Sequence, residues 1–125
     1  MRIISENGNI IVENVQDFNL GQTLECGQCF RYDRIDADDY IIVAMKKMLH
    51  IKQQDDSLIL YNTSEQEYKG IWEEYFDLER DYGEIKRELV SRNGKIADAI
   101  EAQGGIRILN QEFDEVLISF IISQN

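Results

Sequence analysis

The first 62 residues alternate short apolar runs with polar turns, and this pattern predicts β-strands. The runs are rich in β-branched and aromatic residues, which favour strands. They span residues 9–14, 29–34, 40–45, 48–53 and 57–62. Acidic clusters, such as Asp-Ala-Asp-Asp and Gln-Asp-Asp-Ser, separate several of the runs. Because these connections are short, we expect antiparallel hairpins.

The period of the apolar residues changes to that of a helix after residue 63. Ser64 and Glu67 have the spacing of a capping box, and an aromatic face follows them. That face consists of Tyr68, Ile71, Trp72, Tyr75 and Phe76. Asp81 and Glu84 repeat the box before another apolar face, Gly94 indicates a stop, and residues 95–103 predict a further short helix. A sheet followed by helices is an α+β arrangement.

The last segment, residues 110–125, predicts a helix of a different kind. From Val116 to Ile122 every residue except Ser119 is apolar, and a helix that is hydrophobic nearly all round belongs inside a larger core. We therefore expect the chain to be a piece of a longer protein. The Gly104-Gly105 pair suggests the boundary, with one domain at residues 1–104 and the opening helix of a second at 105–125.

Composition and charge narrow the possible functions. A chain of 125 residues suits a compact domain, and no stretch approaches the roughly 18 apolar residues of a membrane span. The N-terminus also lacks the continuous apolar region of a secretory signal, so we expect a cytoplasmic protein without membrane partners. The net charge of −11 argues against this chain alone binding a phosphate backbone.

Both cysteines, Cys26 and Cys29, lie in a C-x-x-C spacing within Glu25–Tyr32. The spacing fits a redox motif, half of a zinc site, or two small residues beside Gly27 and Gln28. A zinc site needs further ligands, and beyond these thiols the chain offers only His50 and carboxylates. A redox motif is expected to open a helix, whereas this one leads into a strand-like run. We therefore expect neither a metal nor a cofactor.

Three segments carry a family resemblance. They are "FNLGQTLECGQCFRY", "YFDLERDY" and "GIRILNQEFDEVLISFIISQN". In order and spacing they resemble successive signatures of the N-terminal part of 8-oxoguanine DNA glycosylases. The resemblance implies a TBP-like twisted antiparallel sheet with covering helices, followed by the first helix of a helix-hairpin-helix glycosylase domain. The pattern of strands and helices supports the sheet part independently.

The resemblance also implies roles for single residues. Such enzymes flip the damaged base out of the duplex, and a backbone carbonyl accepts a hydrogen bond from the N7–H that distinguishes 8-oxoguanine from guanine. The matching carbonyl here is that of Gly27, although a glycine needed only for a bend is the alternative. Phe120 resembles an aromatic residue of the lesion pocket, with plain core as the alternative. Asn125 resembles the asparagine that contacts the orphaned cytosine, and Gln28 and Phe30 are expected to support the site.

Two departures from the family pattern matter. Phe113 stands where relatives usually have proline, so the last helix can begin differently. The catalytic lysine and aspartate of the family would lie beyond Asn125, so no catalytic residue is expected in this chain.

We therefore expect the N-terminal portion of an 8-oxoguanine DNA glycosylase/AP lyase of base-excision repair, in the bacterial cytoplasm near the nucleoid. Its partner would be damaged double-stranded DNA in the complete enzyme. Alone, the chain should be inactive, bind DNA weakly or not at all, and be able to form a homodimer through residues 112–125. The alternatives are a stand-alone acidic protein-interaction module that keeps the fold without the chemistry, and a thiol-disulfide protein.

Overall fold

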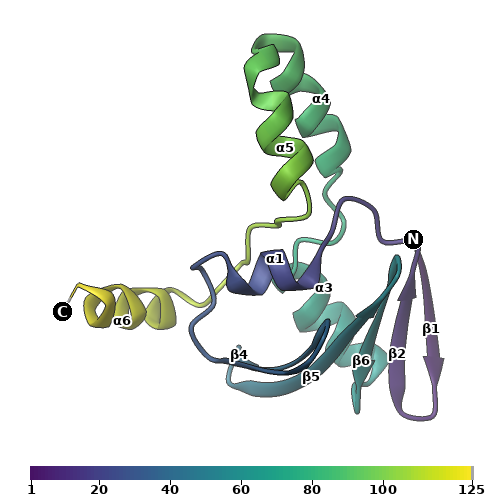
Figure 1. Ribbon diagram of the computed structural model, residues 1–125. Helices are drawn as coiled ribbons and strands as arrows, with labels where there is room; N and C mark the ends of the chain where they lie inside the picture. Colours follow the sequence, from purple (N-terminus) through teal and green to yellow (C-terminus); the bar gives the residue numbers. More distant parts are fainter. Residues whose placement is uncertain (125) are drawn as a thin grey trace.

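The computed structural model describes residues 1–124 and shows a six-stranded sheet covered by helices (Figure 1). The strand order is β1-β2-β6-β5-β4-β3, and every neighbouring pair is antiparallel. The strands are β1 (Arg2–Glu6), β2 (Asn9–Glu13), β3 (Tyr32–Asp36), β4 (Asp39–Ala44), β5 (Lys47–Gln54) and β6 (Ser57–Tyr61). The predicted α+β class and antiparallel pairing are confirmed.

Two details of the strand prediction were wrong. The edge strand β1 was not predicted, although Asn7 and Gly8, both with positive φ, form its hairpin with β2, and Asn-Gly is a strong hairpin signal. The run at 29–34 was expected to be a strand throughout, but β3 begins at Tyr32. Residues 28–31 are held instead by contacts with other parts of the chain, described below.

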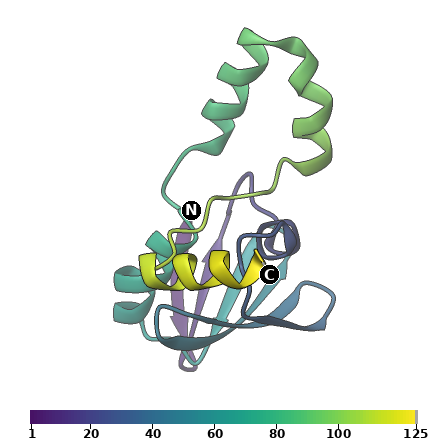
Figure 2. The same ribbon diagram turned by 90° about the vertical axis from the view of Figure 1, so that its left-hand side faces the viewer.

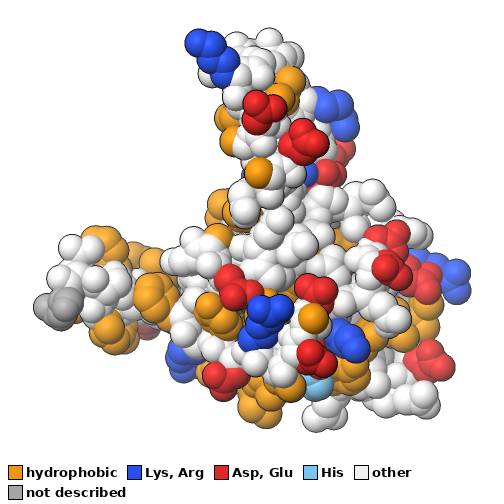
Figure 3. All heavy atoms as spheres, viewed as in Figure 1, with side chains coloured by type: hydrophobic (Ala, Val, Ile, Leu, Met, Phe, Trp, Pro, Cys, Tyr) orange, Lys and Arg blue, Asp and Glu red, His pale blue; other side chains and the backbone are white. Residues whose placement is uncertain are grey.

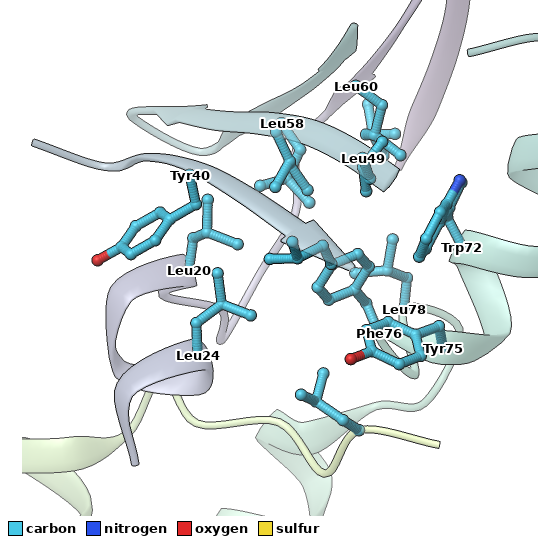
Figure 4. Packing of buried hydrophobic residues seen from close by; sticks show 14 of the residues in the cluster. Leu20, Leu24, Tyr40, Leu49, Leu58, Leu60, Trp72, Tyr75, Phe76 and Leu78 are labelled. Atoms are coloured by element: carbon cyan, nitrogen blue, oxygen red, sulfur yellow. The ribbon is translucent and has the colours of Figure 1, made fainter. Parts of the chain in front are cut away.

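The core lies on one face of the sheet. Alternate residues of the strands point into it, and α1 (Leu20–Glu25) packs there with the helical segment at residues 65–75 (Figure 4). This segment consists of α2 (Glu65–Glu67), the π-helical turn η1 (Tyr68–Trp72) and α3 (Glu73–Tyr75). Ser64 accepts a 3.0 Å hydrogen bond from the Glu67 amide, so the predicted cap is confirmed. The predicted aromatic face is largely buried as well, with Tyr68, Trp72, Tyr75 and Phe76 in the core.

A helical hairpin projects away from this core, as Figures 1 and 2 show. It consists of α4 (Tyr82–Arg92), the 3₁₀ turn η2 (Gly94–Ile96) and α5 (Ala97–Gln103). Asp81 caps α4 by accepting a 3.0 Å hydrogen bond from the Glu84 amide. Neither α4 nor α5 has a buried residue, and an ion pair of 2.8 Å between Lys86 and Asp17 joins α4 to the main body.

Residues 105–111, here called the strap, return from the hairpin across the main body. The Asn19 amide donates a 2.8 Å hydrogen bond to the Gly105 oxygen, and the Asn110 amide donates one of 2.9 Å to the Tyr75 oxygen. A Cβ on Gly105 would lie 2.3 Å from the Cβ of Asn19, so a glycine permits this close approach. The strap is therefore bonded to the sheet domain, and the division between residues 104 and 105 stays a prediction.

The strap leads into α6 (Phe113–Ser123), the predicted last helix. Phe113 is its first residue, the position at which proline is also well accommodated. The apolar side chains of α6 are exposed: Phe113, Val116, Leu117, Ile118, Phe120, Ile121 and Ile122. Figure 3 shows hydrophobic side chains gathered on the visible face of α6, at the left of the view. Among residues 1–124 there is no helix with the length and apolar character needed to span a membrane.

Candidate functional site

The short helix α1 positions the start of the site. Asn19 caps it by accepting a 2.9 Å hydrogen bond from the Gln22 amide, and Leu20 and Leu24 anchor it in the core. The helix was not predicted, although an asparagine followed by leucines four positions apart is a signal that could have identified it. Because α1 ends at Glu25, the loop with Gly27 emerges directly from its C-terminal end.

Gly27 has a φ of +97°, in the left-handed region that side chains disfavour. Apart from Gly27 itself and its two chain neighbours, no residue has an atom within 4 Å of the position that a Cβ would occupy. The backbone conformation, rather than crowding, therefore demands a glycine in this structure. The open space beside Gly27 is compatible both with a bend and with the close approach of a ligand, so the role of its carbonyl stays a prediction.

Gln28 holds this loop against the strap. Its side-chain nitrogen donates hydrogen bonds of 2.6 Å to the Arg107 oxygen and 3.2 Å to the Thr23 oxygen. Its side-chain oxygen accepts one of 2.9 Å from the Leu109 amide, and its backbone oxygen accepts one of 2.6 Å from Gln111 Nε2. Both ends of the amide are thus used by protein groups. This is the geometry that a supporting residue requires.

The strap itself is anchored by a buried arginine that sequence reasoning missed. Arg107 donates hydrogen bonds of 2.6 Å to Gln16, 2.6 Å to Asp77 and 2.9 Å to Arg80, all to backbone oxygens. Its guanidinium carbon also lies 4.2 Å from the centroid of the Tyr82 ring. Burial lowers the pKa of Arg107 from its usual value. A lone arginine between apolar residues gives no sequence signal for such a set of carbonyl contacts.

Gly27 and Phe120 meet at a hollow of about 250 Å³ between the loop after α1 and the exposed face of α6. Its lining consists of Gly27, Gln28, Phe30, Gln111, Val116, Ser119, Phe120 and Ser123. Two aromatic side chains, Phe30 and Phe120, are 52% and 59% exposed here. The hollow thus offers rings, hydroxyl groups and two amide side chains beside an accessible glycine backbone. Asn125 lies outside the described residues.

A larger hollow of about 510 Å³ lies next to it and shares Phe30 and Ser119. Two of its acidic side chains form ion pairs with basic side chains on the other side of the hollow. Arg31 lies 3.2 Å from Glu115, and Lys46 lies 3.9 Å from Glu112. We place the candidate site in the smaller hollow because only that one contains Gly27.

The two cysteines have different environments. Cys26 is exposed at the C-terminal cap of α1, and its thiol lies 3.3 Å from the Thr23 oxygen. Cys29 is buried, and burial raises the pKa of its thiol despite a hydrogen bond with Tyr75. The motif thus follows a helix instead of opening one. In the part of the chain that the structure describes, no cluster of three or more potential metal-ligating side chains occurs.

Comparisons with known proteins assign the chain to a family. No curated protein matches the sequence significantly. The model of the 8-oxoguanine DNA glycosylase N-terminal domain, however, matches residues 10–117, which is most of the chain.

Solved structures agree with that match. MBOgg1 in complex with a low-affinity DNA ligand is 42% identical with a TM-score of 0.92, covering 99% of this chain and 43% of that one. The 8-oxoguanine glycosylase/lyase of Clostridium acetobutylicum, bound to dsDNA with cytosine opposite 8-oxoG, is 43% identical with a TM-score of 0.93, over 100% of this chain and 43% of that one. Its apo form gives a TM-score of 0.91 at the same 43% identity, over 98% and 43% of the two chains.

The present chain spans less than half the length of these solved proteins. The family match, over residues 10–117, and the structural matches all include strands β2 to β6, the helical hairpin and the strap. The chain therefore belongs to the 8-oxoguanine DNA glycosylase family, as its N-terminal domain.

Proposed function

We propose that this chain supplies part of the lesion-base contact of an 8-oxoguanine DNA glycosylase/AP lyase in base-excision repair. The observation that carries the proposal is the hollow in which Gly27 and Phe120 meet, although they lie far apart in the sequence. The solved neighbours include complexes with DNA, which supports DNA as the partner. We also propose that the protein works near the nucleoid of a bacterial cell, where such a substrate lies.

The chemistry of recognition follows from one atom of the base. N7 of guanine accepts a hydrogen bond, whereas N7 of 8-oxoguanine carries a proton and donates one. The carbonyl of Gly27 would attract the damaged base and repel the normal one. Phe120 and Phe30 would cover the faces of the flipped base, because aromatic rings stack readily on bases.

Catalysis would depend on groups outside this chain. No lysine lines the Gly27–Phe120 hollow among the described residues, so an amine nucleophile is not at hand there. The net charge of −11 also disfavours tight binding of a phosphate backbone. We propose that the chain alone binds DNA weakly, does not cleave it, and pairs through residues 112–125.

The test is an NMR titration of the ¹⁵N-labelled 125-residue chain with 8-oxo-2′-deoxyguanosine and, separately, with 2′-deoxyguanosine. The damaged nucleoside should shift the amide signals of Gly27, Gln28 and Phe120 more than the normal one does. A Gly27→Ala variant should lose the difference, since its backbone leaves the left-handed region.

Gly8→Ala is the matched control, because Gly8 also has a positive φ and open space but lies in the β1–β2 turn. It should keep the preference for the damaged nucleoside. Equal shifts with both nucleosides, or shifts confined to other surfaces, would contradict the proposed recognition. The same outcome would favour the stand-alone interaction module.

A further inference from the structure

The face of the sheet that points away from the core carries a set of apolar side chains, interrupted by His50 and Lys52. Ile11 on β2 lies directly opposite Ile4 on β1 and Ile59 on β6. In the next row Tyr61 pairs with His50, and His50 pairs with Ile41. The outer band, as we call it, consists of Ile4, Ile11, Ile41, Val43, Met48, Ile59 and Tyr61. Where one face of a sheet is in contact with solvent, the strand residues on that face are normally polar, so the apolar residues of this band require an explanation.

No described element covers the outer band. The helices α1 and 65–75 contact the opposite face, where the buried strand residues lie (Figure 4). Met48 is 73% exposed, and the remaining band residues are partly exposed. Two shallow hollows border the band, one of about 280 Å³ containing Ile11 and Ile59, the other of about 300 Å³ containing Ile41 and Val43. Another molecule can therefore reach the outer band both at β2 and β6 and at β4.

Acidic side chains gather at one end of the same strands. The β3–β4 and β5–β6 turns meet there, since the Gln53 amide donates a 2.8 Å hydrogen bond to the Asp38 oxygen. The acidic rim, as defined here, consists of Glu13, Asp36, Asp38, Asp39, Asp55 and Asp56. Glu13 and Asp39 have basic neighbours, at 3.8 Å from Arg2 and 2.6 Å from His50. The rim remains richer in carboxylates than in cations, because Arg34 and Lys52 are the other basic side chains of these strand ends.

Charge decides between the possible occupants. DNA is repelled by the rim, and a second copy that docked its own band here would bring a second acidic rim close to this one. A positively charged partner is attracted to the same rim. The other face of the sheet already packs against helices, and a helix on a sheet is a common layer arrangement.

We propose that the outer band and the acidic rim bind a basic amphipathic helix of another protein. Its apolar stripe would cover the band, and the long stems of its lysines and arginines would carry their charges to the rim. The Gly27–Phe120 hollow lies beyond α1 and shares one residue, Phe30, with the hollow that borders Ile41 and Val43. A helix centred on Ile11 and Ile59, which line a different hollow, would leave the Gly27–Phe120 hollow open.

The probe is a synthetic amphipathic helical peptide of leucine and lysine, titrated into the ¹⁵N-labelled 125-residue chain. Amide shifts should map to β2, β4, β5 and β6, and binding should weaken as salt is added. A peptide of the same composition in scrambled order, and one with glutamate in place of lysine, should bind at least about tenfold more weakly. Shifts confined to α6, or equal affinities for the lysine and glutamate peptides, would overturn the proposal.

Variants separate the two parts of the surface. Val43→Thr combined with Ile59→Thr preserves β-branching and should weaken binding about tenfold, as should Asp55→Asn combined with Asp56→Asn. Val90→Thr, on the hairpin, is the matched control and should bind as the unaltered chain does. Amide spectra of each variant verify the fold first.

If both double variants retain the affinity of the unaltered chain, the proposal is wrong. Shifts of the band on adding a DNA duplex would assign the surface to nucleic acid instead. A dimer that the threonine variant abolishes would assign it to a second copy. Because none of these measurements involves the damaged base, failure here is distinguishable from failure of lesion recognition.

Discussion

The side-chain nitrogen of Gln28 lies 2.6 Å from the backbone oxygen of Arg107. This contact joins the loop after α1 to the strap, and the Gln28 side-chain oxygen binds the Leu109 amide of the same strap. The amide side chain of Gln28 thus helps to fix the position of Gly27 relative to α6.

Gln28→Ala should destabilise the protein and loosen the hollow. The substitution leaves the Leu109 amide and the Arg107 oxygen without their partner, and an unsatisfied buried group costs about 1–3 kcal/mol. Urea denaturation measures the loss. Gln66→Ala, at an exposed helical position, is the control and should change the free energy of unfolding little. Equal stability of the two variants would show that the Gln28 contacts contribute nothing.

Arg107→Lys should lower the free energy of unfolding by about 2–3 kcal/mol, because a single ammonium group cannot reach the Gln16, Asp77 and Arg80 oxygens together. Stacking on Tyr82 is lost as well. Thermal or urea unfolding detects the change. Arg92→Lys is the matched control, since Arg92 forms an exposed pair with Glu88 on α4, and such pairs contribute about 0–1 kcal/mol.

Stability should fall in alkali as tyrosines ionise. Burial, together with the hydrogen bond to Glu25, raises the pKa of Tyr40 from 10.0 to about 12. In the unfolded chain the phenol therefore loses its proton first, so the contribution of Tyr40 is complete below pH 10 and is lost as the pH rises towards 12. Burial also raises the pKa of Tyr68, Tyr75 and Tyr82, which should steepen the loss.

Urea midpoints measured across this alkaline range, with phenolate absorbance as a second signal, test the effect. Tyr40→Phe should reduce the slope of stability against pH, because one raised pKa is removed. A slope identical to that of the unaltered chain would exclude Tyr40 as a contributor.

The two thiols should react at very different rates. Exposed Cys26 should be alkylated readily, whereas buried Cys29, whose raised pKa disfavours the thiolate, should react only when the protein opens. Mass spectrometry after a short pulse of maleimide, with and without urea, gives both rates. Equal rates in native buffer would mean that Cys29 is accessible, and stoichiometric zinc in the purified protein would contradict the absence of a metal role.

Self-association should depend on α6. Leu117, Ile118 and Phe120 are all 45% exposed or more, and burying one such side chain fully contributes roughly 1.5–3 kcal/mol. Light scattering at high micromolar concentration should show a dimer that Leu117→Ser with Ile118→Ser dissociates. Leu89→Ser, on the exposed part of α4, is the control. A monomer in every case would exclude pairing through this helix.

Incubation with a duplex containing 8-oxoguanine opposite cytosine should give no strand cleavage, and borohydride should trap no covalent adduct. Among the described residues, no lysine lines the Gly27–Phe120 hollow. An adduct above the no-protein control would place a reactive amine within this chain.

Local signals predicted much of the fold. Alternation of apolar residues identified most strands, and the hydroxyl of Ser64 and the carboxylate of Asp81 marked helix starts that the structure confirms. The two helix caps depend on hydrogen bonds between residues three positions apart in the sequence. The π-helical turn at Tyr68–Trp72 and the buried Arg107 could not be predicted in this way, because packing against distant segments determines them.

The same distinction between local signals and distant contacts applies to the candidate site. The resemblance singled out Gly27 and Phe120, and the structure brings them to one hollow, while their roles toward a base stay predictions. The sequence could not show which groups the Gln28 side chain binds, because its partners Arg107 and Leu109 lie far along the chain. Phe30, expected to support the site, is 52% exposed and lines three of the hollows described above, and its role also stays a prediction.

The strap also has a consequence for the order in which the molecule forms. Arg107 binds Gln16 across a separation of 91 positions, and its amide binds the Thr23 hydroxyl across 84. Closing so long a loop is entropically costly until the groups at both ends are already in place. During synthesis the sheet can fold while the strap is still inside the ribosome, so the hollow beside Gly27 is the last part of the domain to take shape.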